Sequence, residues 1–410
     1  MPFEIALSGL SAAMADLNAT ANNIANVNTT GFKLSRAEFA NQFAVSPYGL
    51  ASNAIGAGVK VSGVRQQFAQ GDINFTNNNL DLAISGPGFY TLSRGGATVY
   101  SRAGNFGVDK DGYVVDPSGD RLQAFPPSSA TGAVGAGFDT GRLIPLQMAT
   151  TDSSPSATTS ISVGTNLPAD AKVPVTSPFN PTVSTSYTNT TSVTSYDSLG
   201  VAHTTSLYYV KSPVANTWDM YTYTDGAAVS GPDLLVYDTS GALVTPAGGT
   251  LPLPAYLPPD GAAPMTMSLD LSKSTQYASS FSVNKLTQDG FTTGQLSGIS
   301  VGKSGIVTAD YTNGQSIGLG QVALTNFANP QGLQQLGDNA WSESYDSGQP
   351  LRGAAGTSAF GQIQSGALEA SNVDLTAQLV NMITAQRDFQ ANAQVISTSD
   401  QITQTIIQLR

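Results

Sequence analysis

The sequence predicts a mixed, mainly β fold: antiparallel β-domains in the middle of the chain, and N- and C-terminal α-helices paired as a coiled coil. Both ends carry apolar residues at heptad spacing, whereas the middle has short alternating runs separated by turn dipeptides. Between about residues 59 and 360 no helical period is sustained. The 410 residues are enough for more than one domain.

The first helix is expected over residues 3–27, where apolar residues recur in alternating steps of four and three. Gly31 is well placed to stop this helix. Asn22, Asn23, Asn26 and Asn28 allow two interpretations: they terminate the helix, or they form a polar ladder between packed helices. The residues expected to pack along the helix are Leu7, Leu10, Met14, Leu17 and Ile24.

The last forty residues repeat the pattern. Ser371 and Asn372 can cap a helix that begins near Val373 and Asp374. The residues expected to pack along this second helix are Leu375, Leu379, Met382, Phe389, Ile396, Ile402, Ile406 and Leu409.

The terminal helices are expected to be marginal by themselves. Burying the apolar seam residues of one helix offsets only part of the conformational entropy lost when the segment becomes ordered. We therefore expect ends that are mobile in the monomer and ordered by neighbouring subunits. The alternative is an intramolecular helical hairpin against the β-domain.

The middle of the chain is predicted to be antiparallel β-structure, because turn dipeptides such as Asp225-Gly226 separate short runs of alternating apolar and polar residues. Ser and Thr are concentrated over 150–200, which suggests an inserted domain. The predicted division is an N-terminal axial helix with a connecting segment (1–70), the first half of an inner β-domain (71–149), an inserted outer β-domain (150–285), the second half of the inner domain (286–359) and a C-terminal axial helix (360–410).

Composition narrows the possible functions. The net charge is −11 and cysteine is absent, so nucleic-acid binding, zinc fingers and thiol chemistry are not expected. Two long charge-free runs, 173–196 and 239–259, are rich in hydroxyl residues or proline and predict no membrane insertion. His203, the one histidine, is expected on an exposed strand without a catalytic role. No catalytic, metal or cofactor site is predicted, although the aspartates could in principle supply a glycosidase pair.

Two terminal segments are specific enough to suggest a family. Residues 21–33 (ANNIANVNTTGFK) closely resemble the N-terminal signature of bacterial flagellar rod and hook proteins, and 368–375 (LEASNVDL) with 385–392 (AQRDFQAN) resemble their C-terminal signature. Residues 79–89 and 101–106 are similar to the inner β-domain of the same proteins. Gln378 departs from the glutamate of many relatives. The signature residues are Asn22, Asn23, Asn26, Thr30, Gly31, Phe32, Ser371, Asn372, Val373 and Asp374.

The length and the segments 319–324 and 327–333 resemble the hook members of this family. The resemblance implies a homo-oligomeric helical tube that serves as a flexible universal joint in the flagellum, outside the cell, reached without a cleaved signal peptide. It implies as partners the distal rod protein, the hook cap protein, the hook–filament junction protein and the flagellar type III export apparatus. A distal-rod subunit and a surface β-adhesin are the alternatives.

Overall fold

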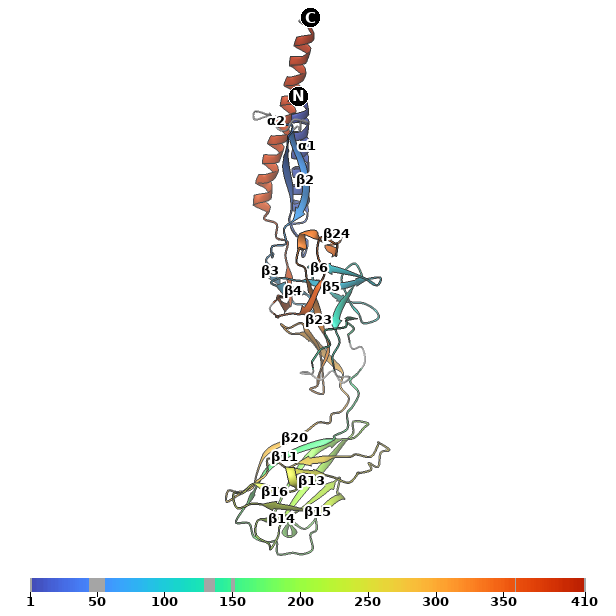
Figure 1. The fold of residues 1–410 in the computed structure, drawn as a ribbon. Helices are drawn as coiled ribbons and strands as arrows, with labels where there is room; N and C mark the ends of the chain where they lie inside the picture. The colour runs from blue at the N-terminus through green and yellow to red at the C-terminus, as the bar shows by residue number, and fades with distance from the viewer. Residues whose placement is uncertain (1, 44–55, 129–136, 149–151, 358, 409–410) are drawn as a thin grey trace. The chain divides into compact units, whose positions relative to one another are not determined.

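The computed structural model describes residues 2–43, 56–128, 137–148, 152–357 and 359–408. These residues are mainly β-structure, with an α-helix near each end of the chain (Figure 1). The prediction of a mainly β fold with antiparallel sheets and terminal helices is thereby confirmed. Within the described ranges, no helix is long and apolar enough to cross a membrane.

The chain forms two compact units, which we describe separately. Unit 1 comprises Met1–Thr150, Gly298–Asp310 and Ser316–Arg410. Unit 2 comprises Thr151–Ser297 and Tyr311–Gln315. Unit 1 is therefore built from both ends of the chain, whereas most of unit 2 comes from one continuous stretch.

The helices α1 (Pro2–Ala25) and α2 (Leu375–Gln408) lie side by side in unit 1 (Figure 1). Gly9 lies against Asn392, and Asn23 is hydrogen-bonded to Gln378, so the helices run antiparallel. Counting back from Gly9 to Pro2 places the start of α1 opposite Ser399. The last turns of α2 consequently extend past the first described residue of α1.

A β-ribbon completes the helical part of unit 1. Strands β1 (Ser35–Gln42) and β2 (Gly58–Gln66) pair antiparallel, with a register shift at Glu38/Phe39. The ribbon packs along α1, where the Ser8 hydroxyl accepts a hydrogen bond from Val59 N at 3.2 Å. The sequence interpretation treated 1–70 as a helix with a connecting segment and did not foresee a ribbon.

The remainder of unit 1 is β-structure around one core. Its main sheet has the strand order β21-β22-β23-β9-β5-β6-β25-β24, and Leu92, Leu122 and Val322 are among its fully buried residues. The strands of this path are β5 (Phe89–Arg94), β6 (Ala97–Ser101), β9 (Arg121–Phe125), β21 (Leu296–Val301), β22 (Ile306–Tyr311), β23 (Ser316–Asn326), β24 (Gln334–Gly337) and β25 (Ala340–Ser342). Shorter strands join it: β7 (Gly107–Val108), β8 (Val114–Val115), β10 (Ile144–Pro145) and β26 (Leu351–Ala354), with the 3₁₀ turn η3 (Pro330–Gly332) before β24.

Two small pairings bring the ends of the chain to this core. Strand β3 (Ile73–Phe75) pairs with β28 (Ala367–Glu369), and β4 (Leu82–Ser85) pairs with β27 (Gln362–Ser365). Both pairs are antiparallel and join residues nearly 300 positions apart. The C-terminal segment therefore reaches α2 only after it has crossed the N-terminal half of unit 1.

Unit 2 contains two sheets whose inner faces share one core, which includes Ile161, Leu207 and Trp218. One sheet contains β11 (Ser160–Pro168), β17 (Thr250–Pro252), β18 (Ser268–Asp270), β19 (Thr275–Tyr277) and β20 (Ser282–Gln288). The other is an antiparallel meander of β12 (Asn189–Tyr196), β13 (Ala202–Lys211), β14 (Thr217–Thr224), β15 (Ala227–Tyr237) and β16 (Leu243–Thr245). The short 3₁₀ turns are η1 (Ser184–Ser186) and η2 (Ala247–Gly249).

Strand pairing in unit 2 follows the prediction with one departure. Asp225 and Gly226, which join β14 to β15, have φ of 49° and 80°, as a two-residue hairpin turn of type I′ requires. However, β11 pairs parallel with β18 and β19, so the sheets are not wholly antiparallel. Parallel pairing needs a long crossover connection. The whole meander lies between β11 and β18 and supplies it.

Candidate assembly surface

The helical part of unit 1 exposes many apolar side chains. α1 buries mainly small residues, Ala6, Ala12, Ala13 and Ala19. A Cβ placed on Gly9 would lie 2.6 Å from the Asn392 side chain, so the helices approach closely through small groups. Several of the larger side chains are left exposed. The exposed apolar residues of the two helices and the ribbon, which we call the axial face, include Phe3, Ile5, Leu7, Met14, Phe39, Val61, Val64, Leu375, Leu379, Val380, Ile383, Val395, Ile402 and Ile407.

Five of the thirteen heptad residues singled out from the sequence belong to this axial face. Leu7 is 47% exposed, Met14 49% and Ile402 56%. Leu375 and Leu379 are exposed as well, whereas Leu10, Leu17, Ile24, Met382, Phe389 and Ile396 are half-buried. Leu409 and the side chain of Ile406 lie outside the described residues. Their role in packing between subunits stays a prediction.

Two expected helix boundaries are corrected by the structure. Asp374, rather than Ser371 or Asn372, caps α2, because its Oδ1 accepts hydrogen bonds from Thr376 N at 2.8 Å and Ala377 N at 3.1 Å. α1 ends at Ala25, before the predicted stop. Gly31 has a different role.

Gly31 lies at a close approach between two backbone segments. It has φ of 69°, and a Cβ there would be 2.6 Å from the backbone nitrogen of Ala103. Its own N–H donates to Glu369 O at 2.8 Å. Glycine is therefore required both by the backbone conformation and by the lack of space. The next residue of the signature, Phe32, is buried.

The asparagines serve both interpretations offered for them. Asn23 is buried and bridges three elements: its amide donates to Ser35 O at 2.8 Å and to Gln378 Oε1 at 3.2 Å, while its carbonyl oxygen accepts from Ser35 N at 2.9 Å. It thus forms a polar link between α1, β1 and α2. Asn26 instead bonds back to Asn22 O at 2.9 Å and belongs to the turn that ends α1. Gln378 can accept from Asn23 without introducing a buried charge.

Beneath the helices, three buried charged residues connect distant parts of the chain. Lys33 Nζ lies 2.5 Å from Glu369 Oε1, and Arg102 Nε lies 3.0 Å from Glu369 Oε2, although this second pair lacks hydrogen-bond geometry. The side chains of Lys33 and Glu369 are 0% exposed. Burial lowers the pKa of Lys33; the charge of Glu369 opposes this shift and that of Arg102 adds to it. We call these three residues the anchor.

Backbone groups complete the anchor. Lys33 also donates to Ala69 O at 2.9 Å, and Gly71 N donates to Glu369 Oε1 at 3.0 Å. Nearby, Asn372 accepts from Leu34 N at 2.7 Å and donates to Gln67 O at 2.8 Å. The segment between α1 and β1, the segment before β3 and the segment before α2 are therefore joined at one place.

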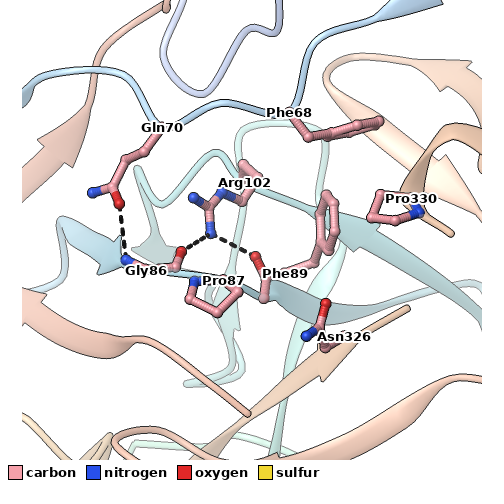
Figure 2. Close-up of a pocket in the computed structure, with 9 residues that line it drawn as sticks. Phe68, Gln70, Gly86, Pro87, Phe89, Arg102, Asn326 and Pro330 are labelled. Carbon is pink, nitrogen blue, oxygen red and sulfur yellow. Dashed lines mark hydrogen bonds between the residues drawn. The ribbon is translucent and has the colours of Figure 1, made fainter. Parts of the chain in front are cut away.

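A small pocket borders the anchor (Figure 2). Its volume is about 260 Å³, and Phe68, Pro87, Phe89 and Pro330 supply apolar walls. Figure 2 shows the Arg102 guanidinium turned toward the loop before β5, where Nη1 donates to Gly86 O at 2.9 Å and to Gly88 O at 2.6 Å. The charge that faces the pocket is thus already engaged within unit 1.

The expectation of an exposed His203 is wrong. His203 lies on β13 and is 4% exposed, with Nδ1 2.6 Å from Asp225 Oδ2 and Nε2 3.3 Å from Asp197 Oδ2. The alternation of β13 turns this side chain inward, toward a loop that contains Tyr256, whose ring lies 5.9 Å from the imidazole. Sequence alternation alone could not say which face of the strand would be covered.

Sequence reasoning also missed the anchor. Lys33, Arg102 and Glu369 all lie within segments that carry the family signature, but no local pattern relates residues so far apart. The available signal was the scarcity of charge, since only 11% of residues are charged and three of these lie within the signature segments. A charge retained in such a place is one that a partner has to neutralise.

Family models match four parts of the chain. Residues 3–33 match "Flagella basal body rod protein", and 364–409 match "Flagellar basal body rod FlgEFG protein C-terminal". Residues 83–167 match "Flagellar hook protein FlgE/F/G D1 domain", and 166–291 match "Flagellar basal body protein FlaE D2 domain". The matches follow one another along the chain, and the D2 match lies in unit 2.

Relatives match over the full length. The flagellar hook protein FlgE of Escherichia coli (strain K12) is 38% identical over 415 residues, which is 100% of each chain. That of Borreliella burgdorferi is 32% identical over 438 residues, 98% of each chain. The crystal structure of the Helicobacter pylori flagellar hook protein FlgE2 is similar in fold, with a TM-score of 0.55, 14% identity, and coverage of 72% of this chain and 100% of that one. The fold, the signature segments and the identity over the whole length together show that this chain belongs to the bacterial flagellar hook protein family.

Proposed function

We propose that this chain is a structural subunit of the flagellar hook, a helical tube of many copies that acts as a flexible universal joint between the rod and the filament. The observation that carries the proposal is the axial face: one part of unit 1 leaves large apolar side chains of both helices and the ribbon unburied. Soluble monomers rarely expose extended apolar patches, and such patches mark interaction surfaces.

The contact between α1 and α2 explains why this face is left for other copies. The helices meet through Ala, Gly, Asn and Gln, so Leu7, Met14 and Leu379 find no place between them. Further helices packed on these side chains would extend the pair into the coiled coil that the heptads indicate. A contact of this kind joins different surfaces of successive copies, and repetition of such a contact generates an open helical polymer.

The two units suggest a division of roles. The helices and ribbon of unit 1 (within 1–70 and 360–410) would line the tube, with the β-part of unit 1 as the inner domain and the Ser/Thr-rich unit 2 as the outer domain. Polar interfaces between outer domains can repack at small cost as the tube bends, while apolar helical contacts hold. In this proposal the chain has no catalytic role.

The family membership also supports the remaining partners. The chain would reach the exterior of the cell through the flagellar type III export apparatus without a cleaved signal peptide. The hook cap protein would promote assembly, and the distal rod protein and hook–filament junction protein would adjoin the two ends of the tube.

The test separates assembly from folding. The double variant Leu7→Gln and Met14→Gln changes two axial-face residues that are about half exposed in the monomer, so it should fold normally yet fail to form tubes. The matched control is Val175→Gln with Val214→Gln, which changes two exposed valines of unit 2 and should assemble as the wild type does. Sedimentation and electron microscopy report assembly, and urea unfolding reports the fold.

Tubes formed by the Leu7/Met14 variant at the wild-type critical concentration would refute the assigned role of the axial face. Tubes of the wild type that remain straight under every condition would contradict the universal joint and favour a rod subunit.

A further inference from the structure

The single histidine of the chain lies in a cluster of acidic side chains within unit 2. A ring nitrogen of His203 and one carboxylate oxygen each of Asp197 and Asp260 lie within 4.8 Å of one another. We propose that this cluster binds a transition-metal dication of the zinc type, with His203 Nε2 and one carboxylate oxygen each from Asp197 and Asp260 as ligands. The proposal concerns unit 2 by itself and does not depend on assembly.

The turn that follows β12 positions Asp197. Its Oδ1 accepts hydrogen bonds from Leu199 N at 2.9 Å and Val201 N at 2.8 Å. Its Oδ2 faces His203 Nε2 at 3.3 Å, and the side chain is 0% exposed. One oxygen therefore fixes the turn, and the other remains available as a ligand.

Asp260 and Asp225 likewise use one carboxylate oxygen for a backbone hydrogen bond. Asp260 Oδ1 accepts from Ala262 N at 3.1 Å, which leaves Oδ2 for the cluster. Asp225 Oδ1 accepts from Thr204 N at 2.8 Å, and its Oδ2 lies 2.6 Å from His203 Nδ1. Each carboxylate is thus held by the backbone through one oxygen while the second is directed at the imidazole or at the space beside it.

Asp225 fixes the tautomer of His203. A carboxylate only accepts hydrogen bonds, so Nδ1 carries the proton and donates to Asp225. In the neutral ring the lone pair then lies on Nε2, on the side of Asp197 and Asp260. An imidazole whose outer nitrogen donates to a carboxylate is the arrangement that orients metal-ligating histidines.

The number of carboxylates favours a metal ion, rather than a second proton, at His203 Nε2. A protonated imidazole has two N–H groups, which Asp225 and Asp197 would match. Asp260 lies within hydrogen-bonding reach of Asp197 rather than of the imidazole, and three ionised carboxylates with one imidazolium sum to −2. A dication bound to a neutral Nε2, Asp197 and Asp260 uses every group of the cluster and brings the sum of the charges from −2 to −1.

The donor set selects the class of metal. Hard cations such as Ca²⁺ and Mg²⁺ take oxygen ligands, whereas imidazole with carboxylate suits zinc-type ions. Three protein ligands leave a fourth tetrahedral position for water, and Asp260 is exposed, so solvent can reach it. The bound ion would tie the loop that carries Asp260 to the turn after β12, in a chain that has no cysteine for a disulfide.

The experiment uses the full chain with ¹⁵N-labelled histidine. Because the chain has one histidine, every imidazole signal belongs to His203. ZnCl₂ should shift the Nε2 resonance and saturate at one equivalent, while MgCl₂ should not. Asp260→Asn removes an exposed ligand without disturbing the core and should weaken Zn²⁺ binding at least about tenfold. Asp225→Asn should weaken it about 10–100-fold through the orientation of the ring.

Asp289→Asn is the matched control, because Asp289 belongs to the same unit but lies outside the cluster; it should leave Zn²⁺ binding unchanged. Absence of a shift at Nε2 on addition of Zn²⁺ would overturn the proposal. Zn²⁺ binding that Asp260→Asn does not weaken would overturn it equally.

Discussion

Glu369 is the carboxylate on which the anchor depends, so Glu369→Gln is the most informative substitution in unit 1. Glutamine has nearly the same size and keeps an oxygen that can accept from Lys33 and Gly71. It removes only the negative charge. Lys33 and Arg102, with side chains 0% and 5% exposed, would then be two buried cations without a counter-charge.

The expected cost follows from this burial. Breaking a buried ion pair by removing one partner destabilises a protein by about 3–5 kcal/mol, because an uncompensated charge remains inside. Native domains are stable by only about 5–15 kcal/mol in total. At a urea dependence of about 2–3 kcal/mol per molar, the unfolding midpoint of unit 1 should fall by roughly 1–2 M.

The two tryptophans allow each unit to be followed separately. Trp341 is buried in unit 1 and Trp218 in unit 2, and the chain has no others. In a Trp218→Phe background, the fluorescence of Trp341 reports unit 1 alone. In a Trp341→Phe background, Trp218 reports unit 2, whose midpoint Glu369→Gln should not change.

Glu38→Gln provides the matched control, since Glu38 also contacts two cations. Arg36 lies 3.5 Å away and Arg65 3.1 Å away, but these arginines are 66% and 60% exposed. Pairs of this kind contribute about 0–1 kcal/mol. If Glu369→Gln lowers the midpoint no more than Glu38→Gln does, the reasoning about the anchor is wrong.

Three further predictions concern single side chains. Asn23→Ala should lower the free energy of unfolding by about 1–3 kcal/mol and speed amide hydrogen exchange along α1, because its buried partners lose their hydrogen bonds. Asn22→Ala, at an exposed position, should do neither. Gly31→Ala should destabilise unit 1 more than Gly119→Ala does in urea unfolding, since both have positive φ but a Cβ meets described atoms within 4 Å only at Gly31. Burial raises the pKa of Tyr209 to about 12, so between pH 10 and 12 this hydroxyl ionises only in the unfolded chain and should lower the free energy of unfolding of unit 2 by up to about 3 kcal/mol. Tyr209→Phe should remove this part of the pH dependence, and an unchanged slope would count against the reasoning.

The parts of the fold that depend on local pattern could be predicted from the sequence. Heptad steps indicated both helices, and Asp225-Gly226 indicated a hairpin turn that the structure contains. Each of these signals is complete within a few residues, because helix periodicity and turn geometry are local properties.

The parts that depend on distant partners could not be predicted in this way. Nothing near Lys33 indicates that its counter-charge is Glu369, and nothing near His203 indicates which loop will cover it. The cap of α2 shows the same limit at short range. Asn372 and Asp374 are both suitable caps, and Asn372 is engaged elsewhere because the backbone at Leu34 and Gln67 happens to lie beside it.

Because unit 1 is built from separate stretches of the chain, it can fold only after its C-terminal stretch has been synthesised. A ribosome delivers the chain from its N-terminus, so the stretch Thr151–Ser297 is complete while Gly298–Arg410 has yet to be made. Lys33 and Gly31 cannot form their hydrogen bonds to Glu369 until that residue has been synthesised, 336 residues after Lys33. The segment that carries Gly31 and Lys33 is thus synthesised long before the partner that completes its native contacts.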